Sequence, residues 1–183
     1  IIAVSPELAA RQRAHIAAKV TPELAKKVIH LPALPDEIDG MVIGNEVLDA
    51  MPVELIGRDG DSWQHIGVSL QNGQFIQVSR PLSQTGLLQA AEQYFPATEP
   101  YTSELHPAQY AFVRTLADKL KRGAAILIDY GFDAVQYYHP QRHMGTLIGH
   151  YRHHTVHDPF FHIGLTDLTA HVNFTDIAQA AVD

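Results

Sequence analysis

Two short apolar runs, each followed by polar residues, constrain the fold of this chain more than any other feature. Gly40–Gly44 leads into Asn45-Glu46, and Ala124–Ile128 leads into Asp129-Tyr130-Gly131. An unbroken apolar run of this length is typical of a strand that is buried on both faces of a parallel sheet. Helical patterns lie between the strand-like runs, so the sequence predicts an α/β fold.

The first thirty residues predict another strand–helix–strand unit. Residues 1–4 are apolar, and we interpret them as the end of a buried strand whose start lies upstream. Ser5-Pro6, followed by an acidic residue, is a strong helix start, and it predicts a helix from about Pro6 to Lys19. Thr21-Pro22 opens a second, short helix, which leads to an apolar strand at Val28–Leu31.

Residues from about 53 to 80 predict an antiparallel insertion into this α/β core. The strand-like segments are Val53–Ile56, Ser62–Leu70 and Gln74–Val78. Asn72-Gly73, between the last two segments, is the dipeptide preferred in two-residue hairpin turns. Trp63 is expected to be a packing residue there.

Three further helices are predicted, at residues 83–95, at residues 106–121 and from about Thr175 to the end. The second ends at Lys121-Arg122-Gly123, where cations meet the negative end of the helix dipole and Gly suits the position after the last turn. The long stretch after Gly131, up to about Thr166, is rich in His, Tyr and Pro and shows no convincing helix.

Composition excludes several classes of function. The 183 residues are 46% hydrophobic and 18% charged, as in an ordinary globular domain. The formal charge of -7 argues against non-specific binding of nucleic acid or a membrane surface, because both need basic residues. The chain has no Cys, so disulfides and thiolate chemistry are excluded. No apolar run is long enough to span a bilayer.

Polar residues at the ends of the two apolar runs are the main indication of a site. Ligands of open α/β sheets bind outside the carboxyl ends of the strands, so we expect Glu46 and Asp129 to emerge at the same end. If a helix follows Asn45, Glu46 and Asp49 share one face and can grip a cation such as guanidinium. Alternatively, Asn45 caps that helix and the two acids complement its dipole.

Simple alternatives exist for the other polar clusters. Asp129 can cap the helix after its strand, and Ser103 or Glu104 can cap the helix that follows them. Histidines gather in the last third of the chain, and two of them, His150 and His154, would share a helical face. The segment has no HExxH motif and no convincing helix, so we predict solvated loop histidines and no metal site.

Several short sequence motifs, spread over the whole chain, occur in a characteristic order. The longest are Gly44–Val53 and Asp167–Phe174; the shorter ones are Val4–Leu8, Arg11–Arg13, Tyr101–Leu105, Leu127–Gly131, Gly145–Leu147, Asp158-Pro159 and Gly164. In this order the motifs resemble the MidA family of class I S-adenosylmethionine-dependent methyltransferases. That family includes bacterial proteins and a mitochondrial protein arginine methyltransferase that assists assembly of respiratory complex I.

The resemblance implies a Rossmann-like class I methyltransferase sheet, interrupted by the antiparallel hairpin region at about 53–80 and incomplete at both ends. Residues 1–183 would then be the central part of a single methyltransferase domain. The implied cofactor is S-adenosyl-L-methionine, and the implied partner is a protein methylated on arginine, such as a complex I subunit. Neither a nucleic-acid partner nor membrane insertion is expected, whereas a homodimer is allowed. The implied location is the cytoplasm of a bacterium, or the mitochondrial matrix of a eukaryote.

The resemblance also implies roles for individual residues. The catalytic residues would be Glu46, Asp49 and Glu104. The cofactor would be bound by Ser5, Asn45, Glu46, Asp129 and Tyr130. The substrate would be bound by Asp49, Glu104 and His171. Carboxylates that hold two nitrogens of a guanidinium would turn the third nitrogen toward the methyl group.

Two departures from the family keep other functions open. The family's glycine-rich cofactor loop precedes the segment that these residues match, and the acid usually found two places before Ser5 is Ala3 here. The alternative is a catalytically degenerate methyltransferase-fold protein that acts in assembly or interaction. A His-dependent metalloenzyme is a third hypothesis.

Overall fold

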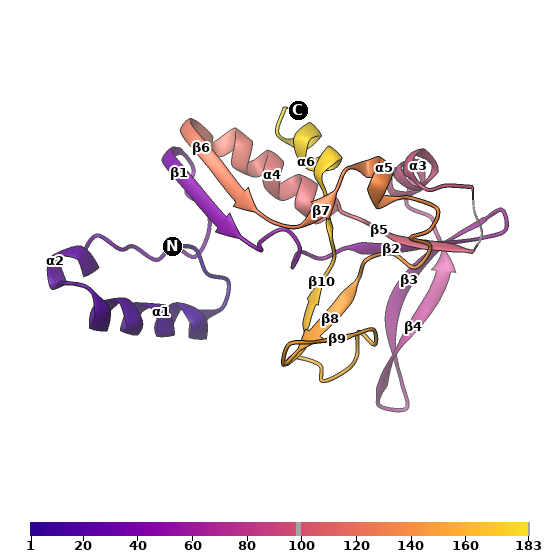
Figure 1. Ribbon diagram of the computed structural model, residues 1–183, viewed down its shortest axis with the longest axis horizontal. Coiled ribbons are helices and arrows are strands. Elements are labelled where there is room, and N and C mark those ends of the chain that lie inside the picture. Colours follow the sequence, from indigo (N-terminus) through magenta and orange to yellow (C-terminus); the bar gives the residue numbers. More distant parts are fainter. Residues whose placement is uncertain (98–99, 183) are drawn as a thin grey trace. The chain divides into compact units, whose positions relative to one another are not determined.

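The computed structural model describes residues 1–97 and 100–182 of the chain. It divides into two compact units, one of residues 1–40 with 118–124 and the other of residues 41–117 with 125–183. Both units mix helices and strands (Figure 1), which confirms the predicted α/β class. No helix within the described ranges combines the length and apolar character needed to cross a membrane.

The first unit contains two helices, α1 (Pro6–Lys19) and α2 (Pro22–Ala25). The Ser5 hydroxyl accepts a hydrogen bond from the backbone N–H of Leu8 at 3.2 Å, and Thr21 caps α2 in the same way. These caps satisfy N–H groups that have no partner inside a helix. Both helix starts and the end of α1 therefore agree with the sequence-based prediction.

The buried strands predicted at residues 1–4 and 28–31 do not form. A single parallel bridge joins Ile2 to Leu31, and it is the β-pairing that residues 1–37 show. Ile2 nevertheless remains 45% exposed. The physical reason is that α1 buries only Ala9, so it offers little apolar surface against which a strand could pack.

Strands β1 (Ile38–Asn45) and β6 (Leu120–Ile128) pair with each other, and their arrows in Figure 1 point the same way. Both strands lie where the sequence predicts them, but the prediction that they are buried is wrong. Ile43 is 71% exposed and Ile128 is 56% exposed. A strand is buried on both faces only where other elements cover it, and among the described strands these two have only each other as neighbours.

The predicted end of the helix before β6 is also wrong. Helix α4 (Pro107–Lys119) runs directly into β6, so Gly123 lies inside the strand rather than beyond a helix. Gly123 has φ 127°, and a side chain there would collide with the carbonyl oxygen of Gly40. Gly123 is therefore required by the close approach of two backbones, not by a helix end.

The second unit contains an antiparallel sheet in the order β4-β3-β2-β5. Its strands are β2 (Glu54–Asp59), β3 (Ser62–Gln71), β4 (Gln74–Pro81) and β5 (Tyr101–Leu105). Asn72 and Gly73 connect β3 to β4, and both have the positive φ that this kind of turn requires. The sequence did not predict β5, which follows helix α3 (Thr85–Tyr94) and pairs with β2.

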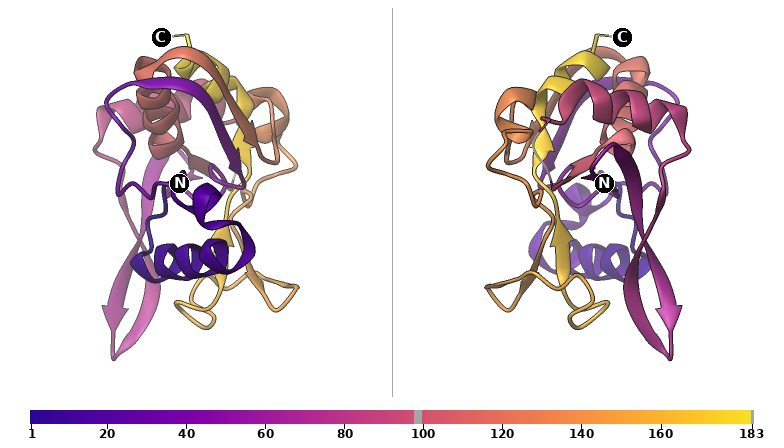
Figure 2. Two further views of the ribbon diagram at one scale, coloured as in Figure 1. Left: turned by 90° about the vertical axis from the view of Figure 1, so that its left-hand side faces the viewer. Right: turned by 90° about the vertical axis from the view of Figure 1, so that its right-hand side faces the viewer.

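After β6 the second unit continues with short elements. They are β7 (Gly131–Phe132), α5 (Ala134–Tyr137), β8 (Ile148–Tyr151), β9 (His154–Val156), β10 (Asp167–Thr169), β11 (Val172–Asn173) and α6 (Phe174–Ala180). The stretch expected to hold loop histidines thus contains strands β8 and β9, which join β10 in a small sheet in the order β10-β8-β9. Figure 2 shows this sheet and the β3–β4 hairpin extending in the same direction, away from α6.

Two hydrophobic clusters form the core of the second unit. In one, aromatic residues of α3, β5 and α5 pack together, and the ring of Trp63 lies 5.7 Å from the ring of Phe95. This confirms the predicted packing role of Trp63. The other cluster joins Leu48, just after β1, to Val113 of α4 and Val172 of β11. It therefore packs the loop that follows β1 against the rest of the unit.

Candidate active site

The ends of β1 and β6 meet, as the sequence predicts. The backbone N–H of Glu46 donates a hydrogen bond to the carbonyl oxygen of Ile128 at 2.8 Å, so the pairing continues to the last residue of β6. Glu46 and Asp129, the next residues along each strand, therefore emerge at the same end. Substrates and cofactors of open α/β sheets bind at this end.

Asp129 holds the loop that follows β1. Its Oδ2 accepts hydrogen bonds from the backbone N–H groups of Val47, Leu48 and Asp49 at 3.1, 2.9 and 3.4 Å, and its Oδ1 accepts one from Tyr130 at 3.0 Å. Consecutive N–H groups that converge on one carboxylate form an anion-binding nest. Asp129 is thus occupied by the protein itself, and it does not cap the next helix, α5.

Glu46 and Asp49 do not share a helical face, because no helix follows β1. Glu46 has φ 50°, a left-handed conformation that is unfavourable for a residue with a side chain. Glu46 and Asn45 are exposed, whereas Asp49 is 3% exposed. A joint grip of Glu46 and Asp49 on one guanidinium is therefore not formed in this arrangement, and the alternative of a helix capped by Asn45 is wrong too.

Asp49 lies beside Tyr130 and Thr169 in a buried polar cluster. The carbonyl oxygen of Asp49 accepts a hydrogen bond from Ala170 at 3.0 Å. Burial, reinforced by the neighbouring Asp49 carboxylate, raises the pKa of Tyr130 to about 12, so its hydroxyl stays protonated near neutral pH. Asp49 Oδ1 and Thr169 Oγ1 are buried without a hydrogen-bond partner in the described part of the chain. The Tyr130 hydroxyl lies within reach of both side chains, which links the three residues in one cluster.

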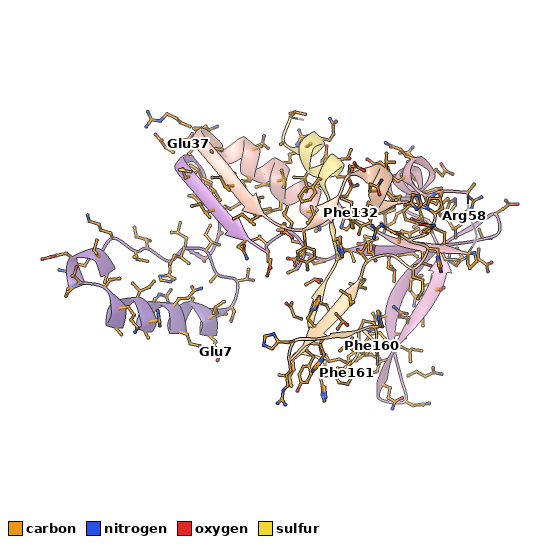
Figure 3. The ribbon with its side chains drawn as sticks, in the orientation of Figure 1. Glu7, Glu37, Arg58, Phe132, Phe160 and Phe161 are labelled. Atoms are coloured by element: carbon orange, nitrogen blue, oxygen red, sulfur yellow. The ribbon has the colours of Figure 1, made fainter. Side chains whose placement is uncertain are left out.

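His171 forms the next layer beyond Tyr130. Its ring lies edge-on to Tyr130 at 5.1 Å and stacks on Phe132, labelled in Figure 3, at 5.2 Å. Burial lowers the pKa of His171, and the nearby Arg142 guanidinium lowers it further, which favours a neutral imidazole. The backbone N–H of His171 donates to the Thr146 hydroxyl at 3.0 Å, which ties this layer to a second loop.

Glu104 is completely buried, and several donors surround its carboxylate. Its Oε1 accepts from the backbone N–H groups of Thr146 and Leu147, both at 2.8 Å. Its Oε2 accepts from the Tyr137 hydroxyl at 2.9 Å and, more weakly, from Thr146 and Ser103. The alternative of a helix cap does not describe this residue, and its predicted contact with substrate stays a prediction. Glu104 instead fixes the loop at residues 146–147, because a buried carboxylate needs this many donors.

Ser5 lies in the first unit, where its hydroxyl is used to cap α1. Its predicted contact with the cofactor stays a prediction. Within the described ranges, no group of three or more His, Asp or Glu side chains could hold a metal ion.

Sequence analysis missed two residues of this region. Thr146 links Glu104 to His171, and the side-chain amide of Gln109 in α4 donates to the carbonyl oxygen of Leu48 at 2.9 Å. Thr146 belongs to the motif at residues 145–147, which was already part of the family resemblance. Gln109 is fully buried, but nothing in the helical pattern of α4 distinguishes it as a site residue.

Comparison with known proteins identifies the family. The model of a family described as "Putative S-adenosyl-L-methionine-dependent methyltransferase" matches residues 1–183. The chain belongs to this family. This agrees with the MidA resemblance, and the α/β fold with mixed sheets is that of its solved relatives.

Two solved structures from Burkholderia thailandensis resemble the chain over its whole length. One is a native protein of the COG1565 superfamily, with 47% identity and a TM-score of 0.90; the chain covers 48% of it. The other is a COG1565 superfamily member bound to S-adenosyl-homocysteine, with 46% identity and a TM-score of 0.91; the chain covers 47% of it. The chain therefore spans about half the length of these family structures.

Curated relatives of the family are more distant. A mitochondrial protein arginine methyltransferase NDUFAF7 homolog of Caenorhabditis elegans is 31% identical over 82% of this chain and 35% of its own length. The mitochondrial protein arginine methyltransferase NDUFAF7 of Xenopus tropicalis is 28% identical over 72% of this chain and 29% of its own length. The chain thus spans about a third of the length of these relatives.

Proposed function

We propose that the full-length protein transfers the methyl group of S-adenosylmethionine to an arginine side chain of a protein. The whole-chain likeness to a structure that holds S-adenosyl-homocysteine is the observation that carries this proposal. That molecule is what remains of S-adenosylmethionine after the methyl group has left. The names of the curated relatives support arginine as the acceptor.

The residues at the ends of β1 and β6 fit this cofactor and acceptor. Asn45 and Glu46 are exposed where the strands end, and the buried Asp49 has a carboxylate oxygen without a partner in the described ranges. We assign Asn45 and Glu46 to the surface that faces the cofactor and the acceptor. Tyr130 and His171 form the wall behind them, and Asp129 holds the loop in shape.

The sulfonium of S-adenosylmethionine supplies an electrophilic methyl group. The protein therefore mainly has to orient the acceptor nitrogen toward this methyl group and exclude water. A guanidinium ion donates hydrogen bonds from all its nitrogens, and a carboxylate accepts two of them in a bidentate pair. We assign this grip to the exposed Glu46. One guanidinium nitrogen forms a bond to the methyl carbon as the sulfur–carbon bond breaks, and the proton lost from that nitrogen passes to the Glu46 carboxylate.

The test is the change Glu46→Gln in the full-length protein, which keeps the size of the side chain but removes its charge. We expect methyl transfer to arginine-containing peptides, measured with S-adenosylmethionine labelled in its methyl group, to fall by roughly 100-fold. Calorimetric titration should show cofactor affinity changed far less. The matched control is Glu37→Gln, the same change at another exposed glutamate, labelled in Figure 3. Unchanged transfer by Glu46→Gln would remove Glu46 from the mechanism.

A second candidate function is assembly or interaction without methyl transfer. Ala3, at the position where the family usually has an acidic residue, is the observation that favours it. Calorimetric titration of the full-length protein with S-adenosylmethionine separates the two, because a scaffold has no need to bind the cofactor. In either case a respiratory complex I subunit is the partner that the resemblance suggests, in the bacterial cytoplasm or the mitochondrial matrix.

A further inference from the structure

A groove lies along one face of the β4-β3-β2-β5 sheet in the second unit. It consists of a cavity of about 710 Å³ and a neighbouring cavity of about 360 Å³. Both cavities are lined by Leu55 and Ile66 of the sheet and by Leu147, Pro159 and Leu168 of the segment that faces it. Because they share these walls, the two cavities adjoin each other, and together we call them the groove.

The smaller end of the groove is apolar and open to water. Its walls include Val68 and Phe75 of the hairpin, and Phe160 and Ile163 of the facing segment. The rings of Phe75 and Phe160 stack at 6.2 Å, and Figure 3 labels Phe160 beside the hairpin. Val68 is 61% exposed and Ile163 is 57% exposed. Apolar side chains gathered in this way favour an apolar occupant, because its burial removes their surface from water.

The larger end of the groove carries one positive charge. Arg142 is the only Asp, Glu, Lys or Arg among the described residues that line it. Its guanidinium lies over the Phe132 ring at 3.9 Å, and its Nε donates to the carbonyl oxygen of Gln136 at 2.9 Å. A guanidinium on this wall of the groove can form a bidentate pair with a carboxylate.

The groove reaches the wall of the candidate active site. Thr146 and His171 line its larger end. The other side of the His171 layer is Tyr130, at 5.1 Å, and Tyr130 adjoins Asp49. The larger end of the groove is therefore linked to the buried Asp49 through two side chains, His171 and Tyr130.

We propose that this groove binds the stretch of the protein substrate next to the methylated arginine. An apolar side chain of that stretch fills the end at Val68 and Phe160, and an acidic side chain pairs with Arg142. Charge complementarity supports this occupant, because the groove has one cation and no carboxylate among its described lining residues. The same cation repels the target guanidinium, which stays at Glu46. The inference rests on the proposed function, since it takes the occupant to be the substrate.

Peptide binding to the full-length protein tests the groove without any methyl transfer. The probes are fluorescein-labelled peptide pools with a central Arg, in which Asp and Leu occupy varied positions within a few residues of it. A matched pool has Lys in place of Asp, and another has Ser in place of Leu. Fluorescence anisotropy measures the affinity of each pool. We expect the Asp–Leu pool to bind roughly tenfold more tightly than the Lys pool or the Ser pool.

Variants locate the binding. Arg142→Gln should abolish the preference for Asp over Lys, and Arg142→Glu should reverse it. Arg152→Gln, which removes an exposed cation outside the groove, should leave the preference intact. Val68→Asp, at an exposed position, should weaken binding of the Asp–Leu pool roughly tenfold. Gln71→Asp adds the same charge on the same strand outside the groove and should have little effect. Circular dichroism of each variant checks that it is folded.

The outcomes separate the two proposals. The proposal that the groove binds substrate would be overturned if the Asp and Lys pools bound equally well. An unchanged preference for Asp over Lys in Arg142→Gln would overturn it too. If arginine peptides are methylated equally well whatever residues flank the arginine, the proposal that the groove binds substrate is overturned and the proposed function is kept. Selective peptide binding without any methyl transfer would keep the groove as a peptide site and overturn the enzymatic proposal.

Discussion

The carboxylate of Asp129 lies 2.9 Å from the backbone nitrogen of Leu48, 81 residues earlier in the chain. This contact joins the end of β6 to the loop that follows β1. The loop carries Glu46 and Asp49, so Asp129 controls where both carboxylates lie. Asp129 thus shapes the loop through its backbone N–H groups, and its expected contact with the cofactor stays a prediction.

Asp129→Ala should destabilise the second unit, because it leaves the N–H groups of the loop without their acceptor. We expect the free energy of unfolding to fall by about 2–4 kcal/mol, and by about 1–2 kcal/mol for Asp129→Asn, which keeps one acceptor oxygen. Urea unfolding measures both. The control is Asp133→Ala, which removes a single capping bond to Gln136 and should cost about 1 kcal/mol. If Asp129→Ala and Asp133→Ala lowered the free energy of unfolding equally, the three N–H groups that converge on Asp129 would stabilise the protein no more than one capping bond does.

Gly145→Ala should be more harmful than Gly164→Ala, although both glycines have positive φ. A side chain at Gly145 would run into the buried Glu104 carboxylate, whereas one at Gly164 would meet open space. We expect Gly164→Ala to cost about 1 kcal/mol from backbone strain alone, and Gly145→Ala to cost about 2 kcal/mol more. Thermal unfolding of the two variants measures the difference. Hydrogen exchange at the Thr146 and Leu147 amides should rise in Gly145→Ala only, because Glu104 is displaced from them.

The stability of the protein should depend on His106 at mildly acidic pH. Burial lowers the pKa of His106 to about 4, and in the unfolded chain it returns to the ordinary value of about 6.5. Between these values the unfolded state binds a proton that the folded state does not, so stability is complete above pH 6.5 and falls as the pH drops toward 4.

The expected loss from His106 is about 3 kcal/mol between pH 7 and pH 4. Urea unfolding at several pH values should show a shallower loss in His106→Gln than in the unchanged protein. His153→Gln, at an exposed position, should leave the pH dependence as it is. Parallel curves for the unchanged protein and His106→Gln would contradict a neutral buried imidazole.

Local chemistry made several elements predictable. Ser5 and Pro6 mark the start of α1, and Asn72-Gly73 marks the hairpin turn, because caps and tight turns depend on a few adjacent residues. The positions of β1 and β6 followed from their apolar runs. Their burial did not, because it depends on what covers each face rather than on the run itself.

The sequence alone determined where the polar residues gather and, through their order, the family to which the chain belongs. Only the tertiary structure decided what each carboxylate does. Glu104 and Asp129 look alike as acids beside strand ends, yet the backbone N–H groups that hold Glu104 lie 42 and 43 residues away, and those of the loop that Asp129 holds lie 80 to 82 residues away. A carboxylate that long-range contacts surround with N–H groups becomes structural, while Glu46, which folding leaves exposed at the same strand end as Asp129, stays available for chemistry.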